Sequence, residues 1–111
     1  MLLAQVYDII GHMGNIATIP LSFKPLLWSA DFSQLDLQKN RKYIIHQLLN
    51  YGDLDAFAWL KRTYSLPALQ ATFIHSPQKM YTDRSFFFVT KFLLNINQQS
   101  LSKIQYVSMA S

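Results

Sequence analysis

The sequence predicts an all-α protein, a compact bundle of about five helices joined by short turns. Apolar residues recur at three- and four-residue spacing along most of the chain, and aspartate, serine and threonine stand where helices need N-terminal caps. Half of the 111 residues are hydrophobic, which is enough for one core. We therefore expect a single helical domain over residues 26–111, preceded by an N-terminal segment, residues 1–25.

The N-terminal segment is expected to form a short amphipathic helix, from Leu2 to His12, followed by an extended connector that ends near Pro25. No lysine or arginine precedes Lys24, and Asp8 interrupts the apolar run. These features argue against a signal peptide, a membrane span and a helix that binds an anionic membrane surface. We expect no membrane contact.

The first helix of the domain is expected to run from Asp36, whose side chain suits an N-cap, to about Asn50. Gly52 follows where a left-handed C-terminal cap is needed, a conformation that glycine adopts without strain. The corner at Gly52 is therefore expected to join two helices of the bundle. The apolar residues of this first helix define one buried face: Leu37, Ile44, Ile45, Leu48 and Leu49.

Two further helices are expected after this corner. Asp53 is the cap of the first of them, and Lys61 and Arg62 lie in its last turn, where the helix dipole favours cations. Ser65 is the cap of the second. A DNA-reading helix-turn-helix is the alternative for this stretch, but Asp53 and Asp55 would then place carboxylates where phosphates should lie.

The stretch RSFFFVTKFLLNI predicts a helix that starts at Thr82 or Asp83 and is apolar nearly all round, with Phe86, Val89, Leu93 and Ile96 in one stripe. Such a helix is normally central in its bundle or buried against a second chain. A strand is the competing interpretation, but the apolar run is too long and does not alternate. A last short helix in the tail is expected to pack through Leu101, Ile104 and Tyr106 or Val107.

The composition favours a protein that covers part of its surface with a partner. Charged residues make up only 14% of the chain, whereas 8 Phe, 6 Tyr and 2 Trp supply large apolar side chains. A surface of this kind usually marks an interaction site, and a monomer with an unusually large core is the alternative. The absence of cysteine excludes a disulfide framework and thiolate metal sites and favours the cytoplasm.

Catalytic and cofactor signatures are missing from the sequence. The three histidines, His12, His46 and His75, include no pair with the spacing of a helical metal site. Neither a glycine-rich phosphate loop nor a nucleophile elbow is present. We therefore expect no cofactor, no metal and no catalytic residue.

One spacing offers a catalytic alternative. Arg41 and His46 form an Arg-x4-His pattern that resembles the motif of the HEPN ribonucleases, all-helical proteins that cleave RNA at a dimer cleft. The resemblance implies that Arg41 would stabilise phosphate charge and that His46 would take part in proton transfer. In the alternative interpretation, His46 is a partly exposed helical residue hydrogen-bonded to solvent.

The net charge of +4 also allows a regulator that binds nucleic acid. Its affinity would fall steeply with salt, because phosphate contacts release counterions. A charge run at a helix start is, however, usually a solvated face. The phosphate contacts of such a regulator would come from Lys39, Arg41, Lys42, Lys61 and Arg62.

The stretch from Leu26 to Leu94 resembles a small bacterial domain of uncharacterised biochemistry. It has that domain's aromatic opening at Trp28, an Asp-x-x-x-Leu-Asp segment from Asp31, an Ile-Ile pair that leads to Gly-Asp, a Leu-Lys-x-x-Tyr helix and an aromatic helix. Members are often encoded beside nucleotidyltransferase toxins of the abortive-infection type. The resemblance implies an antitoxin or accessory partner rather than a toxin.

The leading hypothesis is therefore a non-catalytic module that binds a partner protein, a toxin enzyme according to the resemblance. Association with a second copy of the chain is compatible with the same aromatic surface. Large aromatic side chains dominate protein interfaces, so we expect the anchors among Trp28, Phe57, Trp59 and Phe88. Trp59 is the strongest candidate because it lies off the apolar stripe of its helix, whereas core placement is favoured for Phe57.

Overall fold

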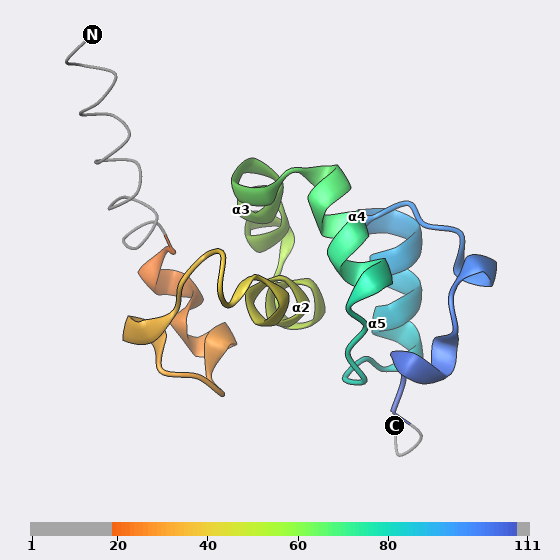
Figure 1. Cartoon of the computed structure of the whole chain (residues 1–111), viewed down its shortest axis with the longest axis horizontal. Helices are drawn as coiled ribbons and strands as arrows, with labels where there is room; N and C mark the ends of the chain where they lie inside the picture. The colour runs from red at the N-terminus through yellow and green to blue at the C-terminus, as the bar shows by residue number, and fades with distance from the viewer. Residues whose placement is uncertain (1–18, 109–111) are drawn as a thin grey trace, which may run out of the picture.

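The computed structural model describes residues 19–108. This part of the chain contains α-helices and short 3-10 segments but no β-strand, so the predicted all-α class is confirmed. The helix expected from Leu2 to His12 lies outside the described residues. The α-helices, labelled in Figure 1, are α2 (Arg41–Tyr51), α3 (Leu54–Tyr64), α4 (Leu66–His75) and α5 (Asp83–Phe88).

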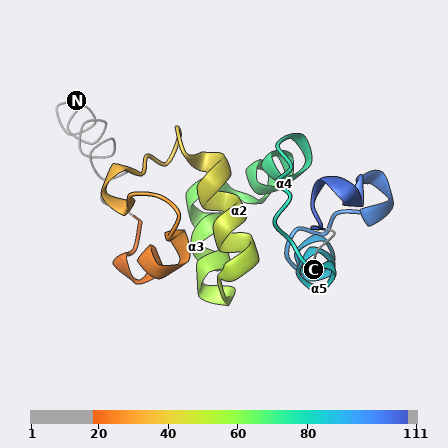
Figure 2. The same cartoon turned by 90° about the horizontal axis from the view of Figure 1, so that it is seen from below.

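Helix α2 is the centre of the arrangement and contacts α3, α4 and a 3-10 segment, η1 (Leu21–Leu27). Figures 1 and 2 show η1 and a second 3-10 segment, η2 (Phe32–Gln34), on one side of α2 and α3, with α4 and α5 on the other. One hydrophobic core connects these elements, and Ile44, Leu60 and Phe73 lie fully buried within it.

Residues 21–25 form part of η1 and correct the expectation of an extended connector up to Pro25. Phe23 and Leu27 of this segment are both buried in the core. The ring of Phe23 meets that of Trp59 edge-on, with the centroids 5.6 Å apart. Pro20, which precedes η1, has ψ at 135°.

Helix α2 begins at Arg41, later than predicted, because Asp36 caps a separate turn. Its Oδ1 atom accepts hydrogen bonds from the backbone nitrogens of Gln38 and Lys39, both at 2.8 Å. The side chain of Asn40 in turn accepts a hydrogen bond from the Asp36 nitrogen at 2.8 Å. Asp36 is thus a cap, as its residue type indicates, but of the turn that precedes the helix.

Gly52 ends α2, but the predicted left-handed conformation is wrong. Its φ of −83° and ψ of 174° are extended backbone that any residue adopts. Glycine is needed here for space: a Cβ atom would stand 2.5 Å from the carbonyl oxygen of Leu48 and 2.6 Å from the Cβ of Ala56. The end of α2 and the start of α3 approach each other too closely for any side chain.

The caps of α3 and α4 are confirmed. The Asp53 carboxylate accepts a hydrogen bond from the Ala56 nitrogen at 3.0 Å, and the Ser65 hydroxyl accepts one from the Ala68 nitrogen at 3.4 Å. Ser65 has φ at 78° and ψ at 153°, a region occupied almost only by glycine. The backbone strain at such a residue is about 1–3 kcal/mol.

We expect the Ser65→Gly variant to be at least as stable as the wild type, since glycine relieves the strain and is a tolerable N-cap. Ser65→Ala keeps the strain and loses the cap, so it should be less stable than Ser65→Gly by about 1–2 kcal/mol. Urea unfolding of both variants measures the difference. Equal destabilisation by glycine and alanine would show that Ser65 is not strained.

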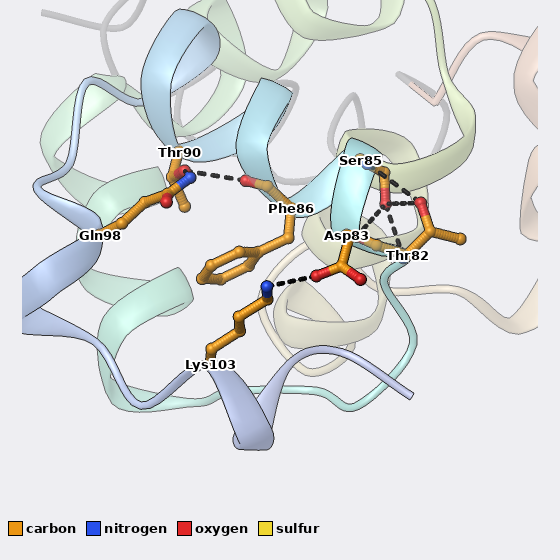
Figure 3. A network of polar contacts seen from close by, with 7 residues as sticks. All are labelled: Thr82, Asp83, Ser85, Phe86, Thr90, Gln98 and Lys103. Carbon is orange, nitrogen blue, oxygen red and sulfur yellow. Dashed lines mark hydrogen bonds and ion pairs between the residues drawn. The ribbon is translucent and has the colours of Figure 1, made fainter. Parts of the chain in front are cut away.

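Helix α5 starts with the predicted cap at Thr82. The Thr82 hydroxyl accepts a hydrogen bond from the Ser85 nitrogen at 3.0 Å, and the Ser85 hydroxyl accepts one from the Thr82 nitrogen at 2.9 Å (Figure 3). After Phe88 the helix widens into a π-helical turn, η3 (Val89–Leu93), which the Leu94 nitrogen closes by donating to the Val89 carbonyl at 2.8 Å.

The π-helical turn changes which side chains face the core. Phe86 and Val89 are buried as predicted, but Leu94 takes the inner position that the regular stripe assigns to Leu93. The wide turn accommodates one extra residue, so the inward position moves on by one. Thr90, also buried, donates from its hydroxyl to the Phe86 carbonyl at 2.8 Å, as Figure 3 shows.

The C-terminal tail forms two 3-10 turns, η4 (Gln98–Ser100) and η5 (Lys103–Gln105), in place of the expected helix. Tyr106 is buried: its hydroxyl donates to the Phe73 carbonyl at 2.6 Å, and the two rings stack with centroids 4.6 Å apart. An ion pair between Lys103 and Asp83 ties the tail to α5 (Figure 3).

Candidate functional site

Three phenylalanines gather on the outside of α5 and η3, and we call Phe87, Phe88 and Phe92 the phenylalanine cluster. All three are exposed, with Phe92 at 62%. Phe92 contacts both of the others: its ring centroid lies 6.0 Å from that of Phe87 and 5.8 Å from that of Phe88. Phe86, Val89 and Leu94 already fill the inner face, so the cluster has no place in the core.

The surroundings of the cluster combine a cation with a largely apolar notch, which Asp53 also lines. The Lys91 ammonium lies over the rings of Phe87 and Phe92, 5.2 Å and 5.7 Å from their centroids. Beside Phe88 is a notch of about 250 Å³ whose walls include Leu93 and the exposed Leu54 from the start of α3. The arrangement can receive an apolar side chain and place an acidic group near Lys91.

The four expected anchors are placed differently from one another. Trp28 and Phe88 are exposed, and Phe57 is half-buried, with the Lys61 ammonium 5.2 Å from its ring centroid. Trp59 is a core residue at 8% exposure, which corrects its rank as the strongest anchor. The ring of Phe23 from η1 packs against Trp59. The sequence did not predict this contact, because Phe23 belongs to the segment that is expected to be an extended connector.

His46 is 1% exposed, so the expectation of a partly exposed, solvated histidine is wrong. Its Nε2 atom donates to the Ser76 carbonyl at 2.7 Å, because a carbonyl oxygen can only accept. Nδ1 therefore accepts from the Tyr81 hydroxyl, also at 2.7 Å. Burial lowers the pKa of His46 to about 4, and the nearby Lys42 acts in the same direction while the Ser76 hydrogen bond opposes both.

Arg41 and His46, the pair of the Arg-x4-His pattern, point in different directions from α2. Five residues on an α-helix correspond to a rotation of about 140° from one side chain to the other. Arg41 is exposed and close enough to Tyr64 to affect its pKa, whereas His46 has both ring nitrogens bonded within the protein. Within one chain, the structure does not bring the two groups to a common site.

The five basic residues expected to contact phosphate fall into separate places. Lys39 and Lys42 line a groove along α2. Arg62 lines a different groove, between η1 and α3, which also holds Asp53 and Asp55. Of the other two residues, Arg41 lies toward Tyr64 and Lys61 over Phe57.

Residues 19–108 contain neither a group of metal-ligating side chains nor a helix that could span a membrane. Acidic and histidine side chains in this range nowhere form a group of three that could hold a metal ion. None of the helices in the same range has the length and apolar character required to cross a membrane.

Comparison with known proteins identifies one related sequence pattern. Residues 22–73 match a family of unknown function (DUF6922). The match runs from η1 into α4 and therefore includes Trp28 and His46 but not the phenylalanine cluster. No curated protein and no solved structure matches the chain. The similarity is consistent with an uncharacterised domain.

Three exposed aromatics were not among the expected anchors: Tyr51, Phe87 and Phe92. For Phe87 a signal was available, because three successive phenylalanines on a helix cannot all face one core. For Phe92 a signal was also available, because the predicted stripe of the helix leaves it on another face. Tyr51 stands at the last position of α2, where helix periodicity does not decide between core and surface.

Proposed function

We propose that the chain is a non-catalytic module that binds a partner protein through the phenylalanine cluster. The observation that carries the proposal is the contact of Phe92 with both Phe87 and Phe88 on the outside of the fold. Single exposed apolar side chains are common on soluble proteins, but a contiguous group of large ones usually marks an interaction site. Aromatic side chains, phenylalanine among them, are enriched at protein interfaces.

The chemistry around the cluster suggests what the partner presents. An apolar side chain of the partner fills the notch beside Phe88 and Leu54. An acidic residue at the edge of the interface faces Lys91, whose ammonium is already held over two rings. Such a rim charge steers association more than it adds affinity.

The partner is a nucleotidyltransferase toxin of the abortive-infection type, with the chain as its antitoxin or accessory subunit. This assignment rests on the resemblance between residues 26–94 and the small bacterial domain encoded beside such toxins. Both proteins act in the cytoplasm, and the interaction involves no cofactor, metal or membrane.

Phe92→Ser tests the interface. We expect it to weaken binding of a nucleotidyltransferase encoded beside this chain by about 30-fold or more, the effect of losing a hot spot of about 2 kcal/mol. The melting temperature of the free chain should change little, because Phe92 is mostly solvated. Calorimetric titration gives the affinity, and thermal unfolding of the free variant gives its stability.

Ile104→Ser is the matched control, since Ile104 is 63% exposed but lies in η5, outside the cluster. It should change neither affinity nor stability. An affinity of Phe92→Ser within about twofold of the wild type would contradict the proposed interface. If the free chain instead forms a dimer that Phe92→Ser dissociates, the cluster is covered by a second copy and not by a toxin.

A further inference from the structure

A groove of about 520 Å³ runs along α2, bordered by Trp28 just after η1 and by Gln78 and Met80 of the loop after α4. It shares no residue with the phenylalanine cluster. Its walls include three aromatic side chains, Trp28, Tyr43 and Tyr51, and two cations, Lys39 and Lys42. Aromatic rings beside cations are the combination with which proteins hold unpaired bases and their phosphates.

Trp28 is exposed at 64%, yet the backbone on both sides of it is fixed. Before it, the Leu26 carbonyl accepts a hydrogen bond from the Gln47 side chain at 2.8 Å. After it, the Ser29 nitrogen donates to the Tyr43 hydroxyl at 3.1 Å. The backbone that carries Trp28 is therefore held beside the groove, while the ring remains open to solvent.

The two outer rings leave room for a ligand ring. The centroids of Trp28 and Tyr51 lie 6.2 Å apart with the planes at 60°, so neither ring covers the face of the other as in a stack. Both are exposed. A planar base can therefore stack on the free face of Trp28 without displacing a protein group.

The charge of the groove matches an anionic ligand. Lys39 and Lys42 are exposed, and its lining contains no aspartate. Asp36 lies in the turn just before α2 and bonds the backbone nitrogen of Lys39, but it is not part of the lining. The groove between η1 and α3, by contrast, contains Asp53 and Asp55 beside Arg62 and would repel phosphate.

We propose that this groove binds single-stranded nucleic acid, with a base stacked on Trp28 and the backbone phosphates at Lys39 and Lys42. A strand fits better than a free nucleotide, because sites for small ligands enclose most of the ligand surface and Trp28 and Tyr51 stand open. A duplex does not fit, because its bases are already stacked and paired. This proposal does not depend on the partner protein.

The test uses fluorescence anisotropy of a labelled single-stranded RNA of about 12 nucleotides with the full chain at about 50 and 200 mM salt. Trp28→Ala is expected to weaken binding at least about fivefold, and Trp28→Phe should restore much of the loss because phenylalanine also stacks. The double variant Lys39→Gln/Lys42→Gln should weaken binding and reduce the salt slope by about 1.4, the value for two phosphate contacts on a single strand.

The double variant Lys61→Gln/Arg62→Gln removes the same charge outside the groove. It should weaken RNA binding much less than Lys39→Gln/Lys42→Gln does. Equal losses from the two double variants would mean unspecific attraction to a basic protein and would overturn the proposal. So would an affinity of Trp28→Ala within about twofold of the wild type, or equally tight binding of duplex RNA. If AMP at micromolar concentration displaced the labelled RNA, the ligand would be a free nucleotide and the proposal of a strand would be wrong. Absence of binding at the lower salt concentration would rule out the site.

Discussion

Gly52→Ala is expected to destabilise the fold by about 2–3 kcal/mol, the effect of forcing an extra methyl group into filled space. The added Cβ would stand 2.5 Å from the Leu48 carbonyl oxygen and 2.6 Å from the Ala56 Cβ. Both belong to rigid helix ends, so neither can move without disturbing α2 or α3. At a glycine with an ordinary negative φ, replacement by alanine would otherwise stabilise by about 0.4–1 kcal/mol. Urea unfolding of the variant at constant m-value gives the difference.

Gly52→Asn separates the two explanations for this glycine. Asparagine tolerates the left-handed conformation, so a glycine required for its φ would be replaced more safely by asparagine than by alanine. If the glycine is required for space, asparagine should lower the stability as much as alanine or more, because its side chain is larger. We expect asparagine to be at least as damaging as alanine. A clearly milder effect of asparagine would restore the left-handed cap that the sequence predicts.

The helical class and most helix starts could be predicted because they depend on local chemistry. Asp53, Ser65 and Thr82 are caps through hydrogen bonds to the backbone within the next three residues. Such bonds are visible in the sequence as residue type and spacing. Gly52 shows the limit: its position at a helix end was predictable, but its reason lies in the approach of α3, which is a tertiary contact.

The positions of the candidate anchors depended on tertiary contacts and were predicted less well. Trp59 lies off the apolar stripe of α3, and the packing of Phe23 from η1 against it contributes to its burial. His46 is buried through partners 30 and 35 residues away, the Ser76 carbonyl and the Tyr81 hydroxyl, which no local pattern indicates. Phe88, in contrast, is exposed because its neighbour Phe86 already fills the core side of α5.

Acidification is expected to destabilise the fold through His46. Its pKa is about 4 in the folded state, against about 6.5 in an unfolded chain. Between about pH 6.5 and pH 4, His46 is therefore protonated in the unfolded state but neutral in the folded state. The free energy of unfolding falls as the pH drops through this range. The total loss is about 3 kcal/mol, because each pKa unit corresponds to about 1.4 kcal/mol. Urea unfolding at pH 7 and pH 4.5 measures most of it.

His46→Gln isolates this contribution from that of the carboxylates. Glutamine does not titrate, and its amide can still donate to the Ser76 carbonyl, so the variant should be less stable than the wild type at pH 7 but lose less on acidification. His75→Gln is the matched replacement of an exposed histidine, at the end of α4, and controls for the loss of an imidazole as such. If His46→Gln and the wild type lost stability equally between pH 7 and 4.5, the histidine would not be held neutral by its burial. The expected outcome instead assigns to His46 a structural role, in which a neutral imidazole joins α2 to the loop after α4 through one donated and one accepted hydrogen bond.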